Sequence, residues 1–314
     1  MKPIVDVMIP TKKPKKEFLI LLDRLERQSV KPNRIIMMNT GEKYLKGECS
    51  QEALLRKYTN LEIYHISENE FDHGNTRNEG IRKSKAPFFI CMTQDAVPAD
   101  EYLLERLLEP LIAGKAAVSY ARQLPKEDCN PVERFVKSFN YPDKSRLKSR
   151  RDLDSLGIKT FFCSNACAAY NRTIFEESGG FIRHTIFNED MIYAAGIISS
   201  GGKIAYTAKA LVCHSHNYSW QDNFRRNFDL GVSQADHPEI FGGVKSESEG
   251  VRLVRETMQY LKKTGNKRLI PSMLWGCGWK LAGYRLGKMY KKLPGWFILK
   301  CSMNRSYWQG MRER

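Results

Sequence analysis

The sequence predicts an α/β fold in which helices flank a mostly parallel sheet, followed by a basic, helical C-terminal extension. Apolar runs alternate with segments of helical spacing over residues 4–122, a pattern typical of parallel strands covered on both faces. Positive charge is concentrated at the other end of the chain: residues 251–314 contain 15 Lys and Arg against two Glu, so most of the net charge of +16 lies there. We therefore expect a nearly neutral domain over residues 1–235 and a basic extension over residues 236–314.

Local patterns predict the elements of the first half of the domain. Residues 4–9 form an apolar run that ends at Pro10, and residues 15–28 carry apolar side chains at helical spacing. Further strands are expected at 34–38, 61–66, 87–93 and 116–122, with helices at 52–58 and 102–112 between them. In such sheets ligands bind beyond the carboxyl ends of the strands, so the polar residues that follow each strand are the candidates for a site.

The second half of the domain is less regular. Residues 143–154 are polar and basic, and we expect a mobile loop there. Residues 160–171 are apolar and small, which suits tight packing near a site. Residues 188–199 have a helical pattern, and residues 203–216 contain one or two strands that end in the sequence HSH.

Several classes of protein are disfavoured by the absence of their motifs. No GxGxxG follows the first strand, and neither GxxxxGK[ST] nor GxSxG occurs. The eight Cys form no CxxC pair, so we expect the reduced, buried thiols of a cytosolic protein. We find no signal-peptide pattern and no apolar run of about 18 residues, so no transmembrane helix is expected.

Acidic residues carry the first two candidate chemistries. Asp95 follows a buried strand, where a carboxylate suits a divalent cation that holds a diphosphate. The alternative is a helix cap, for which Asp100 is better placed. Glu189 and Asp190 stand at a helix start, where they either complement the helix dipole or supply a general base.

Basic residues carry two more. His214 and His216 lie on the same face of a strand, which suits a metal or a phosphate, although a lone His is usually structural. Arg225 and Arg226 have the chemistry to pair with a diphosphate, and a solvated helix face is the alternative for at least one of them.

These motifs occur together in a recognisable order: VDVMIPTKKP, IIMMNTGE, FDHGNTRNEGI, TQDAVP, ARQLP, FNYP, SNACAAY, GGF, NEDM and HSHNYS. Over roughly residues 3–235 the chain resembles the inverting glycosyltransferases of family 2, which have the GT-A fold. The segments DHGNTRN and QDA make it most similar to the bacterial rhamnosyltransferases of that family. The resemblance implies a GT-A catalytic domain at residues 1–235 and a divalent cation, Mg²⁺ or Mn²⁺, as cofactor.

The resemblance also implies roles for particular residues. Asp190 matches the catalytic base, and Asp95 and His214 match metal ligands, although Thr93 stands where the family usually has the first Asp of its metal motif. Asn39 stands where the family has an Asp that accepts the pyrimidine N3–H. The implied donor-binding residues are Pro10, Thr11, Asn39, Asp72, His73, Arg77, Gln94 and Asp95. Contacts to the acceptor or the diphosphate are implied for Glu189, Asn165, His216 and Arg225.

The resemblance implies a reaction as well. The donor would be dTDP-L-rhamnose, and the acceptor a lipid-linked saccharide in the synthesis of a bacterial cell-surface polysaccharide. The departures at Thr93 and Asn39 support an alternative: a non-catalytic subunit that binds a nucleotide-sugar or scaffolds a polysaccharide assembly complex. The intact Asp190 speaks against that alternative.

Residues 71–80, FDHGNTRNEG, join a strand to a helix and are unusually polar. A surface turn, a metal site and a ligand seat are the three interpretations. We expect Asn75 or Thr76 to cap the helix, and Gly74 to provide a tight turn that aims Arg77 at the nucleotide. Asp72 and His73 would then position the base or the sugar.

The C-terminal extension has one segment with a distinctive pattern. On a helical wheel, residues 272–292 place most of their Trp and other apolar residues on one arc and their Lys and Arg on the opposite one. This pattern predicts a helix in a membrane interface, with an anionic membrane surface as partner; a helix packed on the catalytic domain is the alternative. The expected location is therefore cytoplasmic, peripheral on the inner face of the cell membrane. No nucleic-acid-binding module is seen, so no nucleic-acid partner is expected.

Overall fold

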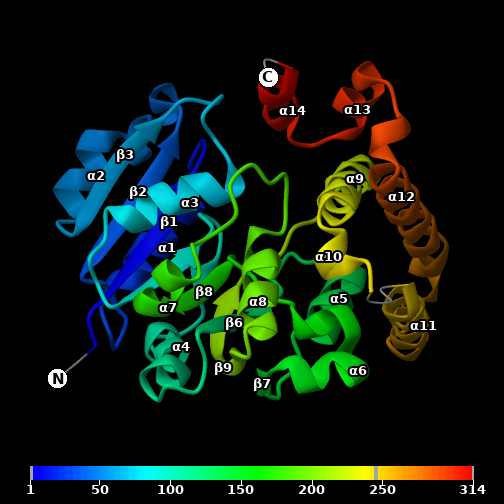
Figure 1. Cartoon of the computed structure of the whole chain (residues 1–314), viewed down its shortest axis with the longest axis horizontal. Helices are drawn as coiled ribbons and strands as arrows, with labels where there is room; N and C mark the ends of the chain where they lie inside the picture. Colours follow the sequence, from blue (N-terminus) through cyan, green and yellow to red (C-terminus); the bar gives the residue numbers. More distant parts are fainter. Residues whose placement is uncertain (1–2, 244–246, 313–314) are drawn as a thin grey trace.

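A computed structural model of the chain describes residues 3–243 and 247–312. Within these residues, a single nine-stranded sheet carries helices on both faces, and the C-terminal helices stack along one side of it (Figure 1). The strand order is β3-β2-β1-β4-β8-β6-β9-β5, and β7 pairs with β9 outside this path. The α/β fold class predicted from the sequence is confirmed.

The strands are β1 (Val5–Thr11), β2 (Arg34–Thr40), β3 (Leu61–Ile66), β4 (Phe88–Met92), β5 (Val97–Pro98), β6 (Val118–Leu124), β7 (Arg146–Lys148), β8 (Cys167–Asn171) and β9 (Ile204–Cys213). The helices of the domain are α1 (Lys16–Glu26), α2 (Gln51–Lys57), α3 (His73–Arg82), α4 (Leu103–Ile112), α5 (Pro131–Asn140), α6 (Leu153–Leu156), α7 (Arg172–Glu177), α8 (Glu189–Ser199) and α9 (Trp220–Asp236). The extension contains α10 (Pro238–Phe241), α11 (Glu247–Lys263), α12 (Ile270–Lys288), α13 (Gly295–Cys301) and α14 (Arg305–Arg312).

The sheet is mixed, which corrects the expectation that it is mostly parallel. The pairs β1–β2, β1–β4, β2–β3 and β6–β9 are parallel, whereas the four pairs that involve β8, β5 or β7 are antiparallel. The start of β8 at Cys167 pairs with the end of β4 at Met92. Because β8 begins where the parallel strands end, it has to run back against them. A short apolar run gives no sign of strand direction, so the sequence could not show this.

The segment predicted to be a mobile loop, residues 143–154, contains β7 and the first two residues of α6. Its anchor is Lys148, whose side chain is buried and whose ammonium group donates hydrogen bonds to the carbonyl oxygens of Lys159 and Phe162. Burial lowers the pKa of Lys148 to about 7. The prediction was wrong because it assumed that all basic side chains of this segment face solvent. The side chain of Lys148 instead donates hydrogen bonds to two buried carbonyl groups.

All eight cysteines are free, and six of them are buried, in agreement with the expectation of reduced, buried thiols. In the described part of the chain, no helix has both the length and the apolarity needed to cross a membrane.

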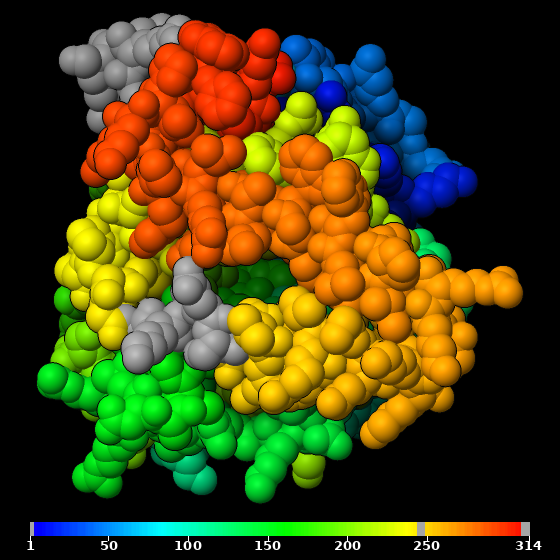
Figure 2. All heavy atoms as spheres, turned by 90° about the vertical axis from the view of Figure 1, so that its right-hand side faces the viewer, coloured from blue at the N-terminus to red at the C-terminus, as the bar shows by residue number. Residues whose placement is uncertain are grey.

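Helix α12 confirms the helix expected near residues 272–292, but the structure divides its apolar arc between two sides. Trp279 packs against Trp220 and Phe224 of α9. Trp275 and Met289, by contrast, are 65% and 51% exposed. The helix therefore packs on α9 with one side and presents several apolar residues to solvent with the other. Figure 2 shows α11 and α12 from this side, with a hollow between them that exposes part of α5.

Glycines make the close contact between α9 and α12. A Cβ atom at Gly287 would lie 2.1 Å from the carbonyl oxygen of Phe228, and one at Gly283 would lie 2.3 Å from that of Phe224. From sequence alone, the glycines of α12 are expected only to weaken the helix. The structure shows that two of them are needed where two backbones approach each other.

We expect Gly287→Ala to destabilise the protein by about 1–3 kcal/mol, because the new methyl group would overlap a backbone atom that cannot move alone. Gly278→Ala is the matched control in the same helix, since a Cβ atom added at Gly278 would meet no neighbouring atom within 4 Å. That substitution should stabilise the helix by up to about 1 kcal/mol. Urea denaturation of both variants measures the two changes, and a shift in the same direction for both would contradict the packing described here.

Candidate functional site

A pocket of about 560 Å³ opens at the carboxyl ends of β1, β2 and β4. Residues that line it from the domain include Pro10, Thr11, Lys12, Thr40, Glu68, Phe71, His73, Arg77, Thr93 and Gln94, and residues 303–306 line it from the C-terminal extension. Five of the eight expected donor-binding residues are in this lining, whereas Asn39, Asp72 and Asp95 are not. Its position fits the rule that ligands bind beyond the carboxyl ends of parallel strands.

The side chain of Gln94 fixes one wall of the pocket. Its amide nitrogen donates to the carbonyl oxygen of Lys12 at 3.0 Å, and its amide oxygen accepts from the backbone N–H of Lys12 at 3.0 Å. Gln94 thus ties the loop after β4 to the end of β1. Through these two hydrogen bonds to the backbone of Lys12, Gln94 helps to fix the shape of the pocket.

Asn39 is fully buried and does not line the pocket. Its carbonyl oxygen accepts from the hydroxyl of Thr11 at 3.2 Å, and its amide nitrogen lies 3.1 Å from Nδ1 of His65. An amide oxygen has two lone pairs, so the expected contact of this oxygen with a pyrimidine N3–H stays a prediction. The neighbouring Thr40 does line the pocket, and its buried hydroxyl has no hydrogen-bond partner among the described residues.

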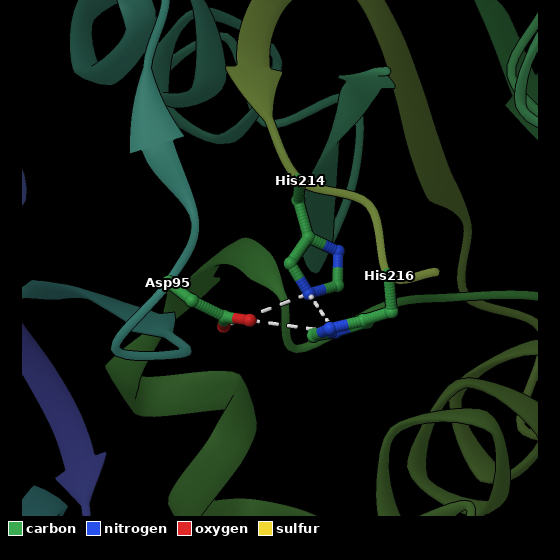
Figure 3. A group of neighbouring side chains, drawn as sticks. All are labelled: Asp95, His214 and His216. Carbon is green, nitrogen blue, oxygen red and sulfur yellow. Dashed lines mark hydrogen bonds and ion pairs between the residues drawn. The ribbon is translucent and has the colours of Figure 1, made fainter. Parts of the chain in front are cut away.

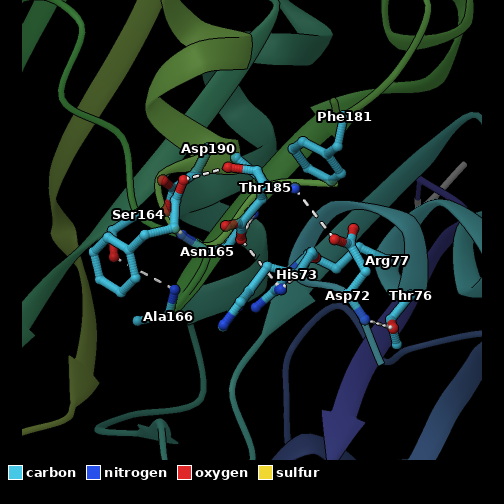
Figure 4. Close-up of polar contacts among 12 residues, drawn as sticks. Asp72, His73, Thr76, Arg77, Ser164, Asn165, Ala166, Phe181, Thr185 and Asp190 are labelled. Carbon is cyan, nitrogen blue, oxygen red and sulfur yellow. Dashed lines mark hydrogen bonds and ion pairs between the residues drawn. The ribbon is translucent and has the colours of Figure 1, made fainter. Parts of the chain in front are cut away.

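Asp72 caps helix α3. The sequence alone predicts Asn75 or Thr76 as the cap. One carboxylate oxygen accepts from the backbone N–H of Asn75 at 2.6 Å, and the other accepts from that of Thr185 at 3.2 Å (Figure 4). Because both oxygens are engaged by backbone groups, Asp72 holds the loop before α8 against α3. The expectation that Asp72 positions the base or the sugar stays a prediction.

Two further residues of the 71–80 segment hold the same loop. A Cβ atom at Gly74 would lie 1.8 Å from the carbonyl oxygen of Ile182, so Gly74 permits a close approach and does not make the tight turn expected of it. Asn78 is buried, and its amide both donates to the carbonyl of Phe181 and accepts from its N–H, at 2.8 and 3.0 Å. Sequence reasoning missed Asn78, although it lies inside the quoted motif.

Arg77 reaches from α3 to the start of α8. Its guanidinium group lies 3.1 Å from a carboxylate oxygen of Glu189, and both side chains are only 6% exposed. Burial raises the pKa of Glu189, but the charge of Arg77 and further contacts outweigh it, so this pKa lies below its ordinary value. His73 beside this pair has a lowered pKa, mainly because its ring is removed from solvent. The Arg77–Glu189 ion pair is therefore buried, and it joins α3 to α8 at the edge of the pocket.

Asn188 sets the geometry of the two acidic residues that follow it. It adopts a left-handed backbone conformation, with φ of 67°, and its side chain donates to the hydroxyl of Ser233 at 3.1 Å. Asn tolerates this conformation better than most residues. The turn brings Glu189 and Asp190 to the start of α8, facing Asn165.

Asn165 orients both acidic side chains. Its backbone N–H donates to Asp190 at 2.8 Å, and its amide nitrogen donates to Glu189 at 3.0 Å. Its carbonyl oxygen accepts from the hydroxyl of Tyr170 at 2.7 Å, so the amide has a fixed orientation. Asn165 is 2% exposed, and its contacts are those of a residue that positions the two acidic side chains; its expected contact with the acceptor or the diphosphate stays a prediction.

Asp190 has the properties of a general base. Burial and the negative charge of Glu189 raise its pKa to about 7, while hydrogen bonds from the backbone of Asn165 and Met191 act in the opposite sense. Asp190 as a residue is half-buried, whereas Glu189 is buried. A base works best when its pKa is close to the working pH, and this environment provides such a value.

Asp95, His214 and His216 form a cluster whose candidate ligand atoms all lie within 4.8 Å of one another (Figure 3). Nε2 of His214 lies 3.6 Å from one oxygen of Asp95, and Nε2 of His216 lies 3.3 Å from the other. The sequence paired Asp95 with His214 as ligands, and the structure adds His216 to them.

The groups around this cluster prepare it to bind a cation. Burial lowers the pKa of His214 to about 3 and also lowers that of His216, which favours the neutral form of both rings. Nδ1 of His214 lies 2.9 Å from the amide oxygen of Gln123, which can only accept a hydrogen bond. His214 therefore carries its proton on Nδ1 and directs the lone pair of Nε2 at the cluster, as metal-binding histidines do. Sequence reasoning missed Gln123, which lies in the quoted ARQLP segment.

The two arginines of α9 differ in their surroundings. Arg226 lies over the rings of Phe187 and Tyr218, at 4.5 and 5.8 Å, and Tyr218 stacks on His216. Arg225 lies instead close enough to Cys301 to influence its ionisation. The expected contact of Arg225 with the acceptor or the diphosphate is therefore better suited to Arg226.

Comparison with known sequences identifies a family and two relatives. The sequence model described as "Glycosyl transferase family 2" matches residues 6–179. The chain is 39% identical to the O-antigen chain rhamnosyltransferase RfbN of Salmonella typhimurium (strain LT2), over 98% of this chain and 97% of the relative. It is 38% identical to the O-antigen chain rhamnosyltransferase WbaN of Salmonella anatum, over 91% of this chain and 90% of the relative.

Comparison with solved structures shows the same fold in more distant proteins. The mannosyltransferase PcManGT from Pyrobaculum calidifontis, in complex with GDP-Man and Mn²⁺, aligns with 100% of this chain and 87% of its own, with a TM-score of 0.56 and 13% identity. Residues 1–349 of S. aureus TarS, in complex with UDP-GlcNAc, align over 92% of both chains with a TM-score of 0.51 and 13% identity.

Proposed function

Since the chain belongs to glycosyl transferase family 2, we propose that it is an inverting glycosyltransferase that moves L-rhamnose from dTDP-L-rhamnose to a lipid-linked saccharide in O-antigen synthesis. Both curated relatives are named as O-antigen chain rhamnosyltransferases, which supports the sugar and the pathway. One observation carries the chemistry: Asp190 is a half-buried residue whose carboxylate is held by the backbone of Asn165 and has a pKa raised to about 7.

In this reaction Asp190 accepts the proton of an acceptor hydroxyl group as the hydroxyl oxygen attacks the anomeric carbon of the donor. The new carbon–oxygen bond forms on one face of the sugar while the bond to the diphosphate breaks on the other, and the diphosphate leaves with the electron pair. A single displacement of this kind inverts the configuration at the anomeric carbon. Glu189 contributes by raising the pKa of Asp190, and Arg77 keeps Glu189 ionised.

Asp95, His214 and His216 would hold a divalent cation. The donor set fits such an ion, because Asp95 offers a carboxylate oxygen and the two histidines offer imidazole nitrogens, all within 4.8 Å of one another. When bound, the cation neutralises charge that develops on the leaving diphosphate. Two imidazole ligands suit Mn²⁺ better than Mg²⁺, which prefers oxygen. The bound Mn²⁺ named for PcManGT is consistent with this choice.

Removal of the cation should abolish most of the activity. We expect EDTA to reduce rhamnosyl transfer, and Mn²⁺ to restore it at a lower concentration than Mg²⁺. In His216→Ala the Mn²⁺ concentration needed for half-maximal activity should rise by about tenfold or more, in line with the loss of one ligand. His237→Ala is a control, because His237 pairs with the exposed Glu239 and is not part of the cluster. Unchanged Mn²⁺ dependence in His216→Ala would remove His216 from the ligand set.

The surface of the extension supports association with a membrane. Exposed apolar side chains include Leu274, Trp275, Leu281, Met289 and Trp296, and exposed Lys and Arg residues lie among them. Such a mixture suits the interface of an anionic bilayer, and we place the protein at the cytoplasmic surface of the membrane on this basis. Vesicle flotation tests this part of the proposal: binding to anionic vesicles, and not to neutral ones, is expected, and no binding to either would contradict it.

The proposal as a whole is tested by incubating the protein with dTDP-L-rhamnose and a panel of lipid-linked saccharides. Mass spectrometry of the products should show the addition of one deoxyhexose to at least one acceptor. Nucleotide binding without transfer to any acceptor would favour the non-catalytic alternative.

A further inference from the structure

The C-terminal extension reaches the pocket at the ends of β1 and β2. Residues 303–306, at the start of α14, line this pocket together with Lys12 and Arg77 of the domain. In Figure 1, α14 lies above the sheet, between β3 and α9, and far from α11, an earlier helix of the extension. The extension therefore folds back over the domain and supplies part of the wall of the site.

Specific contacts hold this segment in place. A carboxylate oxygen of the buried Asp229 in α9 accepts from the backbone N–H groups of Met303 and Asn304, at 3.0 and 3.2 Å. On the other side of the pocket residues, Trp308 is 8% exposed and packs against Tyr290, with ring centroids 5.4 Å apart. Anchors on both sides fix the backbone of residues 303–306 at the pocket.

The cations of the pocket are not equivalent. Lys12 is paired with Glu68 at 2.7 Å, and Arg77 is paired with Glu189 at 3.1 Å. Arg305 lines the same pocket, and its exposed side chain makes no ion pair or hydrogen bond with the residues whose side chains the structure describes, 3–243 and 249–308. Two of the three cations are thus neutralised by protein carboxylates, and Arg305 retains an uncompensated positive charge.

The pocket also presents polar groups that have no protein partner. The hydroxyl of Thr40 and Nε of Arg77 are buried and lack hydrogen bonds among the described residues. Both residues line the pocket. Buried polar groups are rarely left unsatisfied, so a polar ligand is expected here.

Building on the proposed function, we propose that Arg305 binds the diphosphate of the nucleotide-sugar, so that the C-terminal extension completes the donor pocket. A guanidinium group can donate two parallel hydrogen bonds to phosphate oxygens, which gives a strong and directional contact. The negative charge of the diphosphate compensates the one cation of the pocket that the described residues leave unpaired. The extension then has a role in donor binding that is separate from any contact with a membrane.

Isothermal titration with dTDP, UDP and GDP, each with Mn²⁺, tests this role. For whichever nucleotide the wild type binds most tightly, Arg305→Ala should raise Kd by about 10- to 100-fold, as expected for loss of a charged hydrogen bond. Arg305→Lys should have an intermediate effect, because it keeps the charge and loses the planar fork. Binding of the corresponding nucleoside, which has no phosphate, should be the same in the wild type and in Arg305→Ala.

Arg268→Ala is the matched control, because it removes the same charge from an exposed residue of the extension that does not line the pocket. Its Kd for the nucleoside diphosphate should equal that of the wild type. An unchanged Kd in Arg305→Ala, or an equal rise in Arg268→Ala, would overturn the assignment while leaving the proposed function standing. If the wild type binds none of the three nucleotides, the proposed function itself fails, and the assignment of Arg305 fails with it.

Discussion

Asp190→Asn is expected to lower kcat for rhamnosyl transfer by about 10²–10⁴-fold and to leave the Kd for the nucleoside diphosphate within about twofold of the wild-type value. Asn keeps the size of the side chain and can still accept from the backbone N–H of Asn165, but it cannot take a proton from the acceptor. Steady-state kinetics and isothermal titration on the same preparation separate the two effects. A kcat within a few fold of the wild type would show that Asp190 is not the base.

The same assignment predicts a pH dependence. Burial and the charge of Glu189 raise the pKa of Asp190 to about 7, and only the deprotonated form can accept a proton. The wild-type kcat should therefore increase as the pH is raised through about 7. At pH values below about 7, kcat should be lower because Asp190 is protonated. Glu189→Gln removes one cause of the raised pKa, so the midpoint should move to lower pH in that variant. A midpoint that stays in place would show that Glu189 does not act on the base.

Arg77→Ala is expected to destabilise the protein by about 3–5 kcal/mol, because it leaves Glu189 as a buried charge without its partner. The sequence alone suggests that this substitution would mainly weaken donor binding. The structure adds a second effect, since Arg77 also joins α3 to the start of α8. Urea denaturation measures the loss of stability, and donor titration on the folded fraction measures the effect on binding.

Two further variants separate the ion pair from other effects of removing Arg77. Glu189→Gln in the background of Arg77→Ala removes the stranded charge and should recover part of the lost stability. Arg82→Ala is the matched control on the same helix, because Arg82 pairs with Glu79 at an exposed position, 49% and 45% accessible. Its cost should be no more than about 1 kcal/mol. Equal costs for Arg77→Ala and Arg82→Ala would contradict the buried pair.

Much of the fold could be predicted because local sequence patterns report burial. In α1, the apolar positions Phe18, Leu21, Leu22 and Leu25 are all buried as their spacing predicts. The direction of β8 and the order within residues 143–154 could not be predicted, because they depend on which distant groups a segment meets. Lys148 illustrates this limit: only the fold shows that its ammonium group serves two buried carbonyls.

The sequence predicted which residues gather at the candidate site better than it predicted what each of them does there. Asp95 and His214 come together as expected, because both follow strands of one sheet. Asp72 and Asn165 lie beside the site, but their polar atoms are engaged by the protein, and sequence patterns do not show such engagement. No motif in the sequence around Arg305 indicates that it lines the pocket. Its position depends on the path of the extension across α9.

The most direct test of the proposed mechanism is the anomeric configuration of the product. The wild-type protein, supplied with dTDP-L-rhamnose, Mn²⁺ and an accepted lipid-linked saccharide, should form a rhamnoside whose configuration is opposite to that of the donor. Nuclear magnetic resonance of the purified product distinguishes the two anomers. Inversion is predicted, because Asp190 acts as the base in a single displacement, whereas retention would contradict this mechanism.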